Sequence, residues 1–274
     1  MPEVILLSDL KDKRIEPYLW MRRPREMRER GEFVAEGIKV VERLMAAQLE
    51  VKSLLVPLDA VPEIEALTRL YGYTHIKIYA APKPQLEQMV GFPLYQGVMA
   101  LACVPRAISL QELWENTTRP RLWIAIDGLT NAENVGVVVR NAAALGAQGL
   151  LVGKGSSSPW LRRAVRCSMG GVFALKIIEG VDLVQAAAWM RSCEMKSIAV
   201  EITPDAQPLW QLSAHKDVCL FFGQEVGGVK KDVLCAVDGK AYIPMSGNMT
   251  SINVANAVAV ALYEVARQRQ ITTA

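Results

Sequence analysis

The chain has 274 residues, of which 51% are hydrophobic, so it can form a folded protein with a substantial core and room for two domains. Its formal net charge of +3 and pI near 8.6 are only mildly basic, which permits an acidic polymer as partner without requiring one. The five cysteines include no CxxC pair and the chain has only two histidines, which disfavours a disulfide framework and a zinc site.

The sequence predicts a cytoplasmic protein with reduced thiols and with no membrane or metal partner. The first apolar stretch, residues 4–7, is too short for the core of a signal peptide. Residues 241–263 carry no charge and have the length of a membrane span, but they contain Pro244, Gly247 and three asparagines. Because a helix exposed to lipid would not bury these groups, we expect this stretch to belong to a globular domain.

Residues 1–104 predict a small domain with a mixed sheet. Apolar runs and amphipathic patterns predict strands at 54–56, 75–79 and 96–104, and helices at 36–47 and 85–90. The polar stretch 105–120, which ends in Thr117-Thr118-Arg119-Pro120, then predicts a linker between two domains.

Residues 121–274 predict a second domain in which strands and helices alternate. The expected strands are 122–126, 149–152, 198–201, 219–222 and 241–243, and the expected helices are 137–145, 161–167, 183–190 and 251–268. Short apolar strands that alternate with helices indicate an α/β fold with a parallel sheet covered on both faces. Ligands of such sheets bind beyond the carboxyl ends of the strands.

The first of three polar or glycine-rich turns at those strand ends is residues 127–136. It lacks the GxGxxG pattern that a dinucleotide requires, which disfavours a nicotinamide or flavin oxidoreductase. Asn134 and Arg140 are its candidates for contact with a polar ligand. Arg140 would lie one turn into a helix that starts near Gly136, among apolar neighbours, so we expect it to have a defined partner. The alternative is an ordinary surface arginine.

The second and third turns supply further candidates. Residues 223–228 place Glu225 among three glycines, which favours ligand contact through main-chain groups, although a solvated glutamate in a flexible turn fits equally. Residues 243–251 end at Ser251, a candidate N-cap for the last helix. One stripe of that helix is apolar and predicts either core packing or an oligomer contact; it comprises Val254, Val258, Leu262 and Val265.

Taken in order, these turns resemble the three motifs of the SpoU (TrmH-like) RNA 2′-O-ribose methyltransferases of the SPOUT superfamily. The similar segments are Asn134-x-Gly136-x-x-x-Arg140, Phe222-Gly223-x-Glu225-x-x-Gly228, and Ile243-Pro244-Met245 through Ser251-Ile252-Asn253-Val254. Residues 156–171 also resemble the family. Residues 31–37 resemble the opening of the ribosomal-protein-like RNA-binding domain that many members carry, so the resemblance covers most of the chain.

The resemblance implies a SPOUT-type α/β methyltransferase domain at residues 121–274, preceded by a small α/β RNA-binding domain. It also implies a C-terminal trefoil knot, which no spacing argument predicts because true knots are rare. A homodimer and S-adenosylmethionine as cofactor are implied as well. Matched motif by motif, the implied cofactor contacts are Gly223, Gly228, Ile243, Met245 and Ile252. The implied reaction-site residues are Asn134, Arg140, Glu225, Ser251 and Asn253.

The implied reaction moves a methyl group from a sulfonium to a ribose 2′-hydroxyl, which requires in-line alignment and a nucleophile ready to lose its proton. The family assigns this activation to the arginine of the first motif. Because a guanidinium stays protonated in proteins, we expect Arg140 to stabilise the developing alkoxide and to position the adjacent phosphate, with base action as the alternative. Glu225 and Asn253 are expected to fix Arg140 and the cofactor loops.

Two basic segments fit an RNA substrate, ribosomal or transfer. Residues 11–30 hold eight basic and four acidic residues with Tyr18 and Trp20 interleaved, which suits phosphate contacts and base stacking, although a solvated helical face is the alternative. Residues 154–176 hold five basic and no acidic residues, and a helix begun by Ser158-Pro159 would align three of them. The expected RNA contacts are Arg22, Arg23, Arg25, Arg162, Arg163 and Arg166.

The sequence departs from the family pattern in two places. Asn131-Ala132 stands where many members have Asp-Pro, and Ala255 stands where they have serine. Neither change touches Arg140 or Glu225, so we expect catalysis to be retained and leave the cofactor affinity open. The rival hypothesis is a catalytically silent RNA-binding protein of the same fold, which would keep the basic segments and bind no S-adenosylmethionine.

Overall fold

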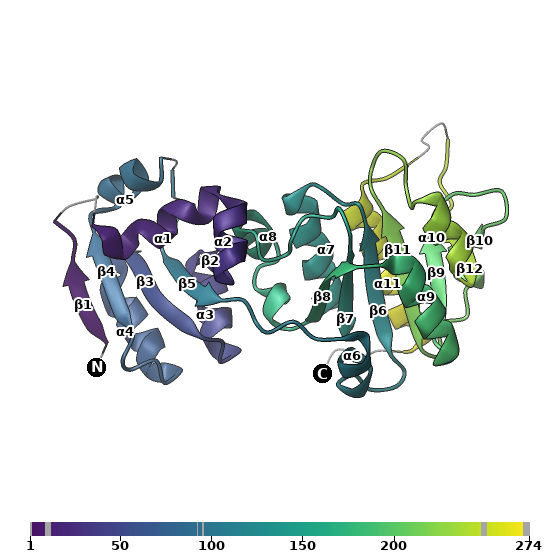
Figure 1. The fold of residues 1–274 in the computed structure, drawn as a ribbon, viewed down its shortest axis with the longest axis horizontal. Helices are drawn as coiled ribbons and strands as arrows, with labels where there is room; N and C mark the ends of the chain where they lie inside the picture. Colours follow the sequence, from purple (N-terminus) through teal and green to yellow (C-terminus); the bar gives the residue numbers. More distant parts are fainter. Residues whose placement is uncertain (1, 9–11, 92, 95, 248–250, 271–274) are drawn as a thin grey trace. The chain divides into compact units, whose positions relative to one another are not determined.

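The structure is a computed structural model that describes residues 2–8, 12–91, 93–94, 96–247 and 251–270, and it divides into two compact units (Figure 1). Unit 1 comprises Met1–Arg106 and Trp160–Phe173, and unit 2 comprises Ala107–Pro159 and Ala174–Ala274. This division differs from the expected one, because residues 160–173 lie in unit 1. The rings of Trp160 and Phe173 pack against Phe33, with centroids 5.1 and 5.9 Å away, which explains why this segment joins unit 1.

Unit 1 contains a five-stranded sheet in the order β1-β4-β3-β5-β2. The strands are β1 (Glu3–Leu6), β2 (Glu32–Glu36), β3 (Val51–Pro57), β4 (Lys77–Ala81) and β5 (Met99–Cys103). The sheet is mixed, as predicted, because β5 runs antiparallel to β2 and β3 whereas β3 and β4 are parallel. The prediction lacks β1, whose side chains are mostly exposed, and β2, which directly follows the basic segment.

Helices cover both faces of this sheet (Figure 1). The helices of this unit are α1 (Glu16–Leu19), α2 (Pro24–Arg30), α3 (Ile38–Ala46), α4 (Val61–Leu70), α5 (Lys83–Val90) and α8 (Arg162–Cys167), of which α8 contacts the edge strand β2. Residues of α1, α2 and α5 share one apolar core with the sheet, in which Tyr18 is fully buried and its hydroxyl lies 2.9 Å from Ser53 Oγ. Helices α3 and α4 bury the opposite face through Val41, Leu44 and Ile64.

Unit 2 contains a seven-stranded sheet in the order β10-β12-β9-β11-β6-β7-β8. The strands are β6 (Leu122–Asp127), β7 (Gly149–Gly153), β8 (Lys176–Val181), β9 (Lys196–Val200), β10 (Gln207–Pro208), β11 (Val218–Gly223) and β12 (Gly239–Tyr242). All neighbouring strands are parallel, which confirms the predicted parallel sheet. Only the two strands at the edges, β8 and β10, are absent from the prediction, because one is half exposed and the other has two residues.

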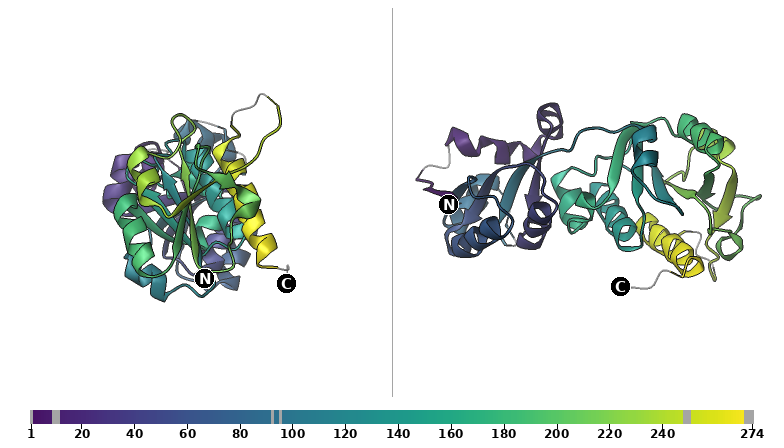
Figure 2. Two further views of the ribbon diagram at one scale, coloured as in Figure 1. Left: turned by 90° about the vertical axis from the view of Figure 1, so that its right-hand side faces the viewer. Right: turned by 90° about the horizontal axis from the view of Figure 1, so that it is seen from below.

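The helices of unit 2 lie in two layers (Figure 2). They are α6 (Leu110–Glu115), α7 (Ala132–Ala144), α9 (Leu183–Ser192), α10 (Lys231–Ala236) and α11 (Val254–Gln268). Trp123 and Phe221 point from the sheet into a core with α6, α9 and α10. On the other face α7 and α11 lie side by side, and Asn141 Nδ2 donates a hydrogen bond of 2.8 Å to the carbonyl of Ala255.

The two helices that carry the motif residues begin at different positions from those expected. Asn131 caps α7 by accepting hydrogen bonds from the amides of Glu133 and Asn134, so α7 begins four residues before Gly136. Asn253, and not Ser251, caps α11 by accepting from the amide of Ala255 at 2.8 Å.

The apolar stripe of α11 is part of the protein core. Val254, Val258, Leu262 and Val265 are all buried within the single chain. Of the two alternatives for that stripe, core packing and an oligomer contact, the structure therefore supports core packing. None of the helices in the described part of the chain combines the length and the apolar character that spanning a bilayer requires.

Candidate functional site

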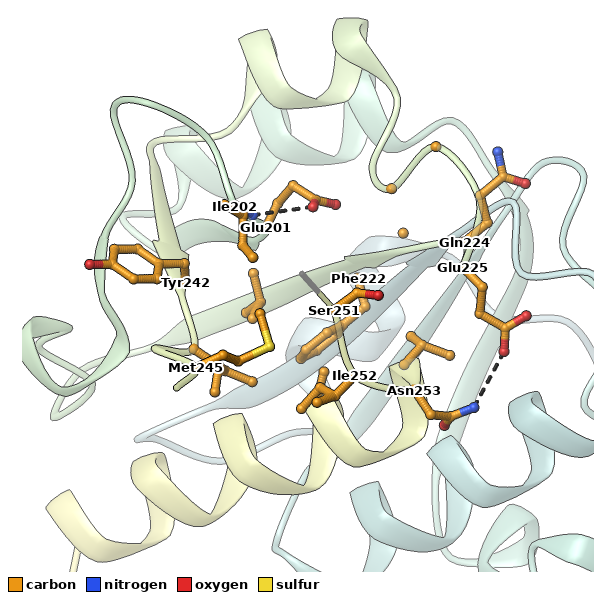
Figure 3. A pocket seen from close by; sticks show the side chains of 17 residues that line it. Glu201, Ile202, Phe222, Gln224, Glu225, Tyr242, Met245, Ser251, Ile252 and Asn253 are labelled. Carbon is orange, nitrogen blue, oxygen red and sulfur yellow. Dashed lines mark hydrogen bonds between the residues drawn. The ribbon is translucent and has the colours of Figure 1, made fainter. Parts of the chain in front are cut away.

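A cavity of about 580 Å³ opens at the carboxyl ends of β9, β11 and β12 (Figure 3). Its volume falls within the range usual for sites that bind small molecules. The residues that line it are Val200, Glu201, Ile202, Phe222, Gly223, Gln224, Glu225, Gly227, Gly228, Tyr242, Ile243, Met245, Ser251, Ile252, Asn253, Val254 and Ala257. The five residues predicted to contact a cofactor are all among them, as are Glu225, Ser251 and Asn253.

The turn after β11 brings backbone against backbone at the cavity wall. The amide of Gly228 donates to the carbonyl of Gln224 at 3.2 Å, which folds the turn back on itself. A Cβ added to Gly223 would lie 1.9 Å from the carbonyl carbon of Gly228, and Gly228 itself has a φ of +64°. Both glycines are therefore required by the geometry of the turn, since a side chain at Gly223 would collide with main-chain atoms.

An ion pair anchors the far end of this turn to the neighbouring strand. Asp127, at the end of β6, is 2% exposed and accepts hydrogen bonds from the Lys230 amide at 2.9 Å and from Lys230 Nζ at 2.6 Å. A buried carboxylate with two such donors is well satisfied. The turn thus starts on β11 and ends at a fixed point beside β6, which holds its main-chain groups at the cavity.

Three predicted reaction-site residues from distant segments meet at one side of the cavity. Asn134 Nδ2 donates a hydrogen bond to Glu225 Oε1. Asn253 Nδ2 lies 3.4 Å from the same Glu225 oxygen (Figure 3). It also lies 3.4 Å from Asn134 Oδ1. The Oδ1 of Asn253 is used as the cap of α11, so its amide nitrogen is left to face the cluster. The three motifs are therefore joined by one hydrogen-bonded cluster.

Arg140 is not part of that cluster. Its side chain is exposed, it does not line the cavity, and among the described residues no hydrogen bond or ion pair reaches its guanidinium. The expectation that Glu225 and Asn253 fix Arg140 is wrong, because both contact Asn134 instead. The reason is helical geometry: six residues along α7 turn the side chain by about 240° from the direction of Asn134.

The cavity wall also contains polar residues that the sequence motifs do not include, notably Glu201, Gln224 and Tyr242. Glu201 ends the predicted strand 198–201, so its place at the carboxyl end of a parallel strand was a usable signal. With Glu225 it brings two carboxylates to the cavity, and the described lining contains no lysine, arginine or histidine. The cavity is therefore electrostatically suited to a ligand that carries positive charge or hydrogen-bond donors.

Comparison with known proteins identifies the family. Residues 121–263, which hold all three motifs and the cavity, match the model of the SpoU rRNA methylase family. The chain belongs to this family. Among its relatives, the 23S rRNA (guanosine-2′-O-)-methyltransferase RlmB of Acinetobacter baylyi is 31% identical over 71% of this chain and 79% of its own length. An uncharacterized tRNA/rRNA methyltransferase of Mycobacterium tuberculosis is 29% identical over 90% of this chain and 84% of its own.

Solved structures show that the chain shares its fold with other methyltransferases. The AdoMet-bound rRNA methyltransferase of Sinorhizobium meliloti has a TM-score of 0.82 at 22% identity, covering 96% of this chain and 98% of that one. The SpoU methyltransferase AviRb of Streptomyces viridochromogenes, in complex with AdoMet, has a TM-score of 0.81 at 23% identity, covering 94% and 99%. Both similarities extend over almost the whole chain.

The second basic segment, residues 154–176, forms part of its contacts within unit 1. Helix α8 begins at Arg162 and not at Ser158-Pro159. The guanidinium of Arg162 pairs with Glu36, which is 3% exposed, and Arg166 Nη1 lies 3.9 Å from the same carboxylate. Arg162 is thus committed to a buried partner, whereas Arg163 and Arg166 remain exposed. Of the three arginines of this segment that are expected to contact RNA, only Arg163 is exposed without a carboxylate near it in the described part of the chain.

The first basic segment also differs from its expected arrangement. Tyr18 is fully buried, which excludes it from stacking on an RNA base, and the Trp20 ring is covered by the guanidinium of Arg30 at 3.4 Å. Arg23, directly before α2, and Arg25, on α2, are both exposed. The side chain of the third predicted contact, Arg22, lies outside the described part of the structure.

Proposed function

We propose that this protein transfers a methyl group from S-adenosylmethionine, bound in the cavity of unit 2, to a ribose 2′-hydroxyl of structured RNA. As a member of the SpoU rRNA methylase family it is an RNA 2′-O-methyltransferase. The observation that carries the assignment to this cavity is the cluster of Asn134, Glu225 and Asn253, which joins the three family motifs at its side. Ribosomal RNA is the first substrate to test, because RlmB relatives are named for 23S rRNA.

The residues of the cavity fit S-adenosylmethionine. The close backbone approach at Gly223 leaves main-chain groups, and no side chain, to face the ligand. Phe222, Ile243, Met245 and Ile252 supply an apolar wall for an adenine ring. When bound, the cofactor supplies an electrophilic methyl group on a positively charged sulfur, and a lining with two carboxylates and no described cation suits that charge.

We assign the cluster of Asn134, Glu225 and Asn253 to holding the reaction geometry. Its hydrogen bonds tie the start of α7, the turn after β11 and the start of α11 to one another. Because methyl transfer requires the acceptor oxygen in line with the bond that breaks, a fixed position of these three elements lowers the barrier through orientation. Ser251 lines the same cavity, and we assign its hydroxyl to a contact with the ribose of the RNA substrate.

We assign Arg140 to the RNA and not to the cofactor. Its exposed guanidinium keeps five N–H donors for a phosphate and for the alkoxide that develops on the ribose. A group that stays protonated is better suited to stabilising negative charge than to removing a proton. Action as a base is the alternative role for this residue.

We further propose a homodimer and the trefoil knot of SPOUT proteins. On the outward side of α11, Val260 is 42% and Tyr263 is 62% exposed, and α11 lies beside α7, which carries Arg140. A second copy that covers this surface would bury both side chains and would also surround Arg140, which lacks described partners in one chain. We place the knot in the C-terminal segment that includes the third motif.

We assign RNA recognition to unit 1 as a ribosomal-protein-like domain, and we expect the protein to act in the cytoplasm. The exposed cations Arg23, Arg25 and Arg163 can contact phosphates. The protein should therefore bind RNA in a salt-dependent way, even when the methyl donor is absent.

The test is a map of ribose methylation in RNA from cells with and without this chain, followed by transfer of labelled methyl groups to the unmodified RNA. We expect one nucleotide to lose its 2′-O-methyl group without the chain and to regain it with purified protein and S-adenosylmethionine. Protein that binds the same RNA but transfers no label would contradict the proposal and favour the silent RNA-binding protein.

A further inference from the structure

Glu201 lies in the cavity wall, and so far it has been assigned only a share in the negative charge of the lining. It directly follows Val200, the last residue of β9, and Figure 3 shows it beside Ile202, whereas Glu225 lies beside Asn253. The cavity therefore carries one carboxylate at the proposed reaction end and a second one away from it. The second carboxylate needs a reason of its own, because placing a charged group in a partly buried position costs free energy.

Main-chain groups hold the Glu201 carboxylate in one orientation. Its Oε2 accepts a hydrogen bond from the amide of Val229 at 3.0 Å, and its Oε1 accepts from the amide of Ile202 at 3.2 Å. A Cβ on Gly228 would lie 2.2 Å from Oε2, so the glycine leaves the space that the carboxylate occupies. The turn after β11 therefore both donates a hydrogen bond to the Glu201 carboxylate and leaves the space that this carboxylate fills.

The Glu201 carboxylate keeps acceptor capacity on the side of the cavity. An ionised carboxylate has about four acceptor positions, and two are used by the amides of Val229 and Ile202. In the part of the chain that the structure describes, no lysine or arginine forms an ion pair with it. A ligand in the cavity can therefore supply the remaining donors.

We propose that Glu201 is a cofactor-positioning residue that accepts hydrogen bonds from the ribose hydroxyls of bound S-adenosylmethionine. The inference rests on the function proposed above. The sulfonium must lie at the end near Glu225 and Asn253, where the RNA hydroxyl arrives, which leaves the adenosyl half for the region of Glu201. Adjacent ribose hydroxyls present two donors to one carboxylate, the pairing that acidic residues make in dinucleotide sites. The amino-acid end of the cofactor is less suitable, because its ammonium lies next to a carboxylate, so that Glu201 would meet a like charge beside the donor.

The test is calorimetric titration of the wild-type protein and of Glu201→Gln. The introduced glutamine side chain keeps an oxygen that can accept from the Val229 amide while it loses the charge. The ligands are S-adenosylmethionine, S-adenosylhomocysteine, whose sulfur is neutral, and the 2′-deoxy analogue of S-adenosylhomocysteine. We expect the substitution to weaken the first two ligands by the same factor, on the order of tenfold, and to change the affinity for the deoxy analogue much less.

Controls separate this role from folding and from charge. Glu179→Gln, at an exposed site on the opposite edge strand β8, should leave all affinities unchanged. The wild-type protein alone should also bind the deoxy analogue about tenfold more weakly than S-adenosylhomocysteine, a comparison that needs no variant.

Three results would overturn the inference while leaving the proposed function intact. They are unchanged binding by Glu201→Gln, a loss confined to the cationic ligand, and equal binding of the deoxy and parent compounds by the wild type. If wild-type protein bound none of the ligands, the proposed function would fail together with the inference.

Discussion

The two sides of the candidate site differ in how completely the single chain builds them. On the cavity side, Gly223 and Gly228 allow a tight turn, and the pair of Asp127 and Lys230 fixes its end. On the α7 side, Arg140 is exposed and has no described partner. The single chain thus preorganises a site for a small ligand. The guanidinium of Arg140, which would contact the RNA, has no contacts that fix its position in the described part of the chain.

The largest effect is expected from Arg140. Arg140→Ala should lower methyl transfer by about 100- to 1000-fold, because a charge that stabilises the developing alkoxide is lost. The dissociation constant for S-adenosylmethionine should not change, since Arg140 does not line the cavity. Parallel measurements of turnover and of calorimetric affinity check both statements.

Arg140→Lys sharpens this prediction, because it retains the charge and removes the planar fork of donors. An intermediate loss of turnover is expected. A lysine variant with a turnover near that of the wild type would contradict the need for a bidentate contact.

The next largest effect is expected on the cavity side, where Gly223→Ala should lower the affinity for S-adenosylmethionine. The added Cβ would lie 1.9 Å from a main-chain carbon, so the turn must open. We expect the affinity for S-adenosylmethionine to fall by about 100-fold, or about 2.7 kcal/mol, in calorimetric titration. The matched control is Gly239→Ala, where the new Cβ would meet only the end of the Ile198 side chain at 3.1 Å. Equal affinities of both variants would show that the turn does not shape the site.

Asn253 links the two sides and should show a mixed effect. Asn253→Ala removes the cap of α11, which should lower the free energy of unfolding by about 1 kcal/mol, and it also removes the contact with Glu225. Asn253→Ser keeps a capping oxygen and loses the amide donor, so its stability should stay near that of the wild type. We expect both variants to lose about tenfold in turnover; a fully active serine variant would limit Asn253 to capping.

The smallest effect concerns the strand beneath the cavity. Cys219 in β11 is fully buried, and burial raises the pKa of its thiol well above the ordinary value, so the reactive thiolate stays rare even in mildly alkaline buffer. Cys235 on α10 is exposed. In native protein a thiol reagent should therefore label Cys235 and spare Cys219, as mass spectrometry would show. Equal labelling of both residues would mean that β11 opens readily.

The sequence was sufficient to predict those parts of the fold that depend on apolar runs and on glycine. The inner strands of the parallel sheet are predicted because their side chains are buried on both faces, and Gly223 and Gly228 mark a turn that no other residue permits. Edge strands such as β8 were missed because their exposed positions carry no apolar pattern.

Side-chain partners were harder to predict, because they depend on where helices begin and on distant residues. The cap at Asn131 moves the start of α7, which turns Arg140 away from Glu225. Glu36 lies 126 residues before Arg162 in the sequence, so their ion pair could not be inferred from local charge. The position of Glu201 at the end of a strand can be predicted from the sequence. Its contact with the turn after β11 cannot, because that turn lies more than twenty residues further along the chain.

The most direct test of the assigned cofactor site is a crystal structure of the protein grown with saturating S-adenosylmethionine. We expect one molecule per chain in the cavity at the ends of β9, β11 and β12, with its methyl group on the side of Asn134, Glu225 and Asn253. A cavity that holds no donor under these conditions, or that holds it with the methyl group turned away from this cluster, would contradict the assignment of the site.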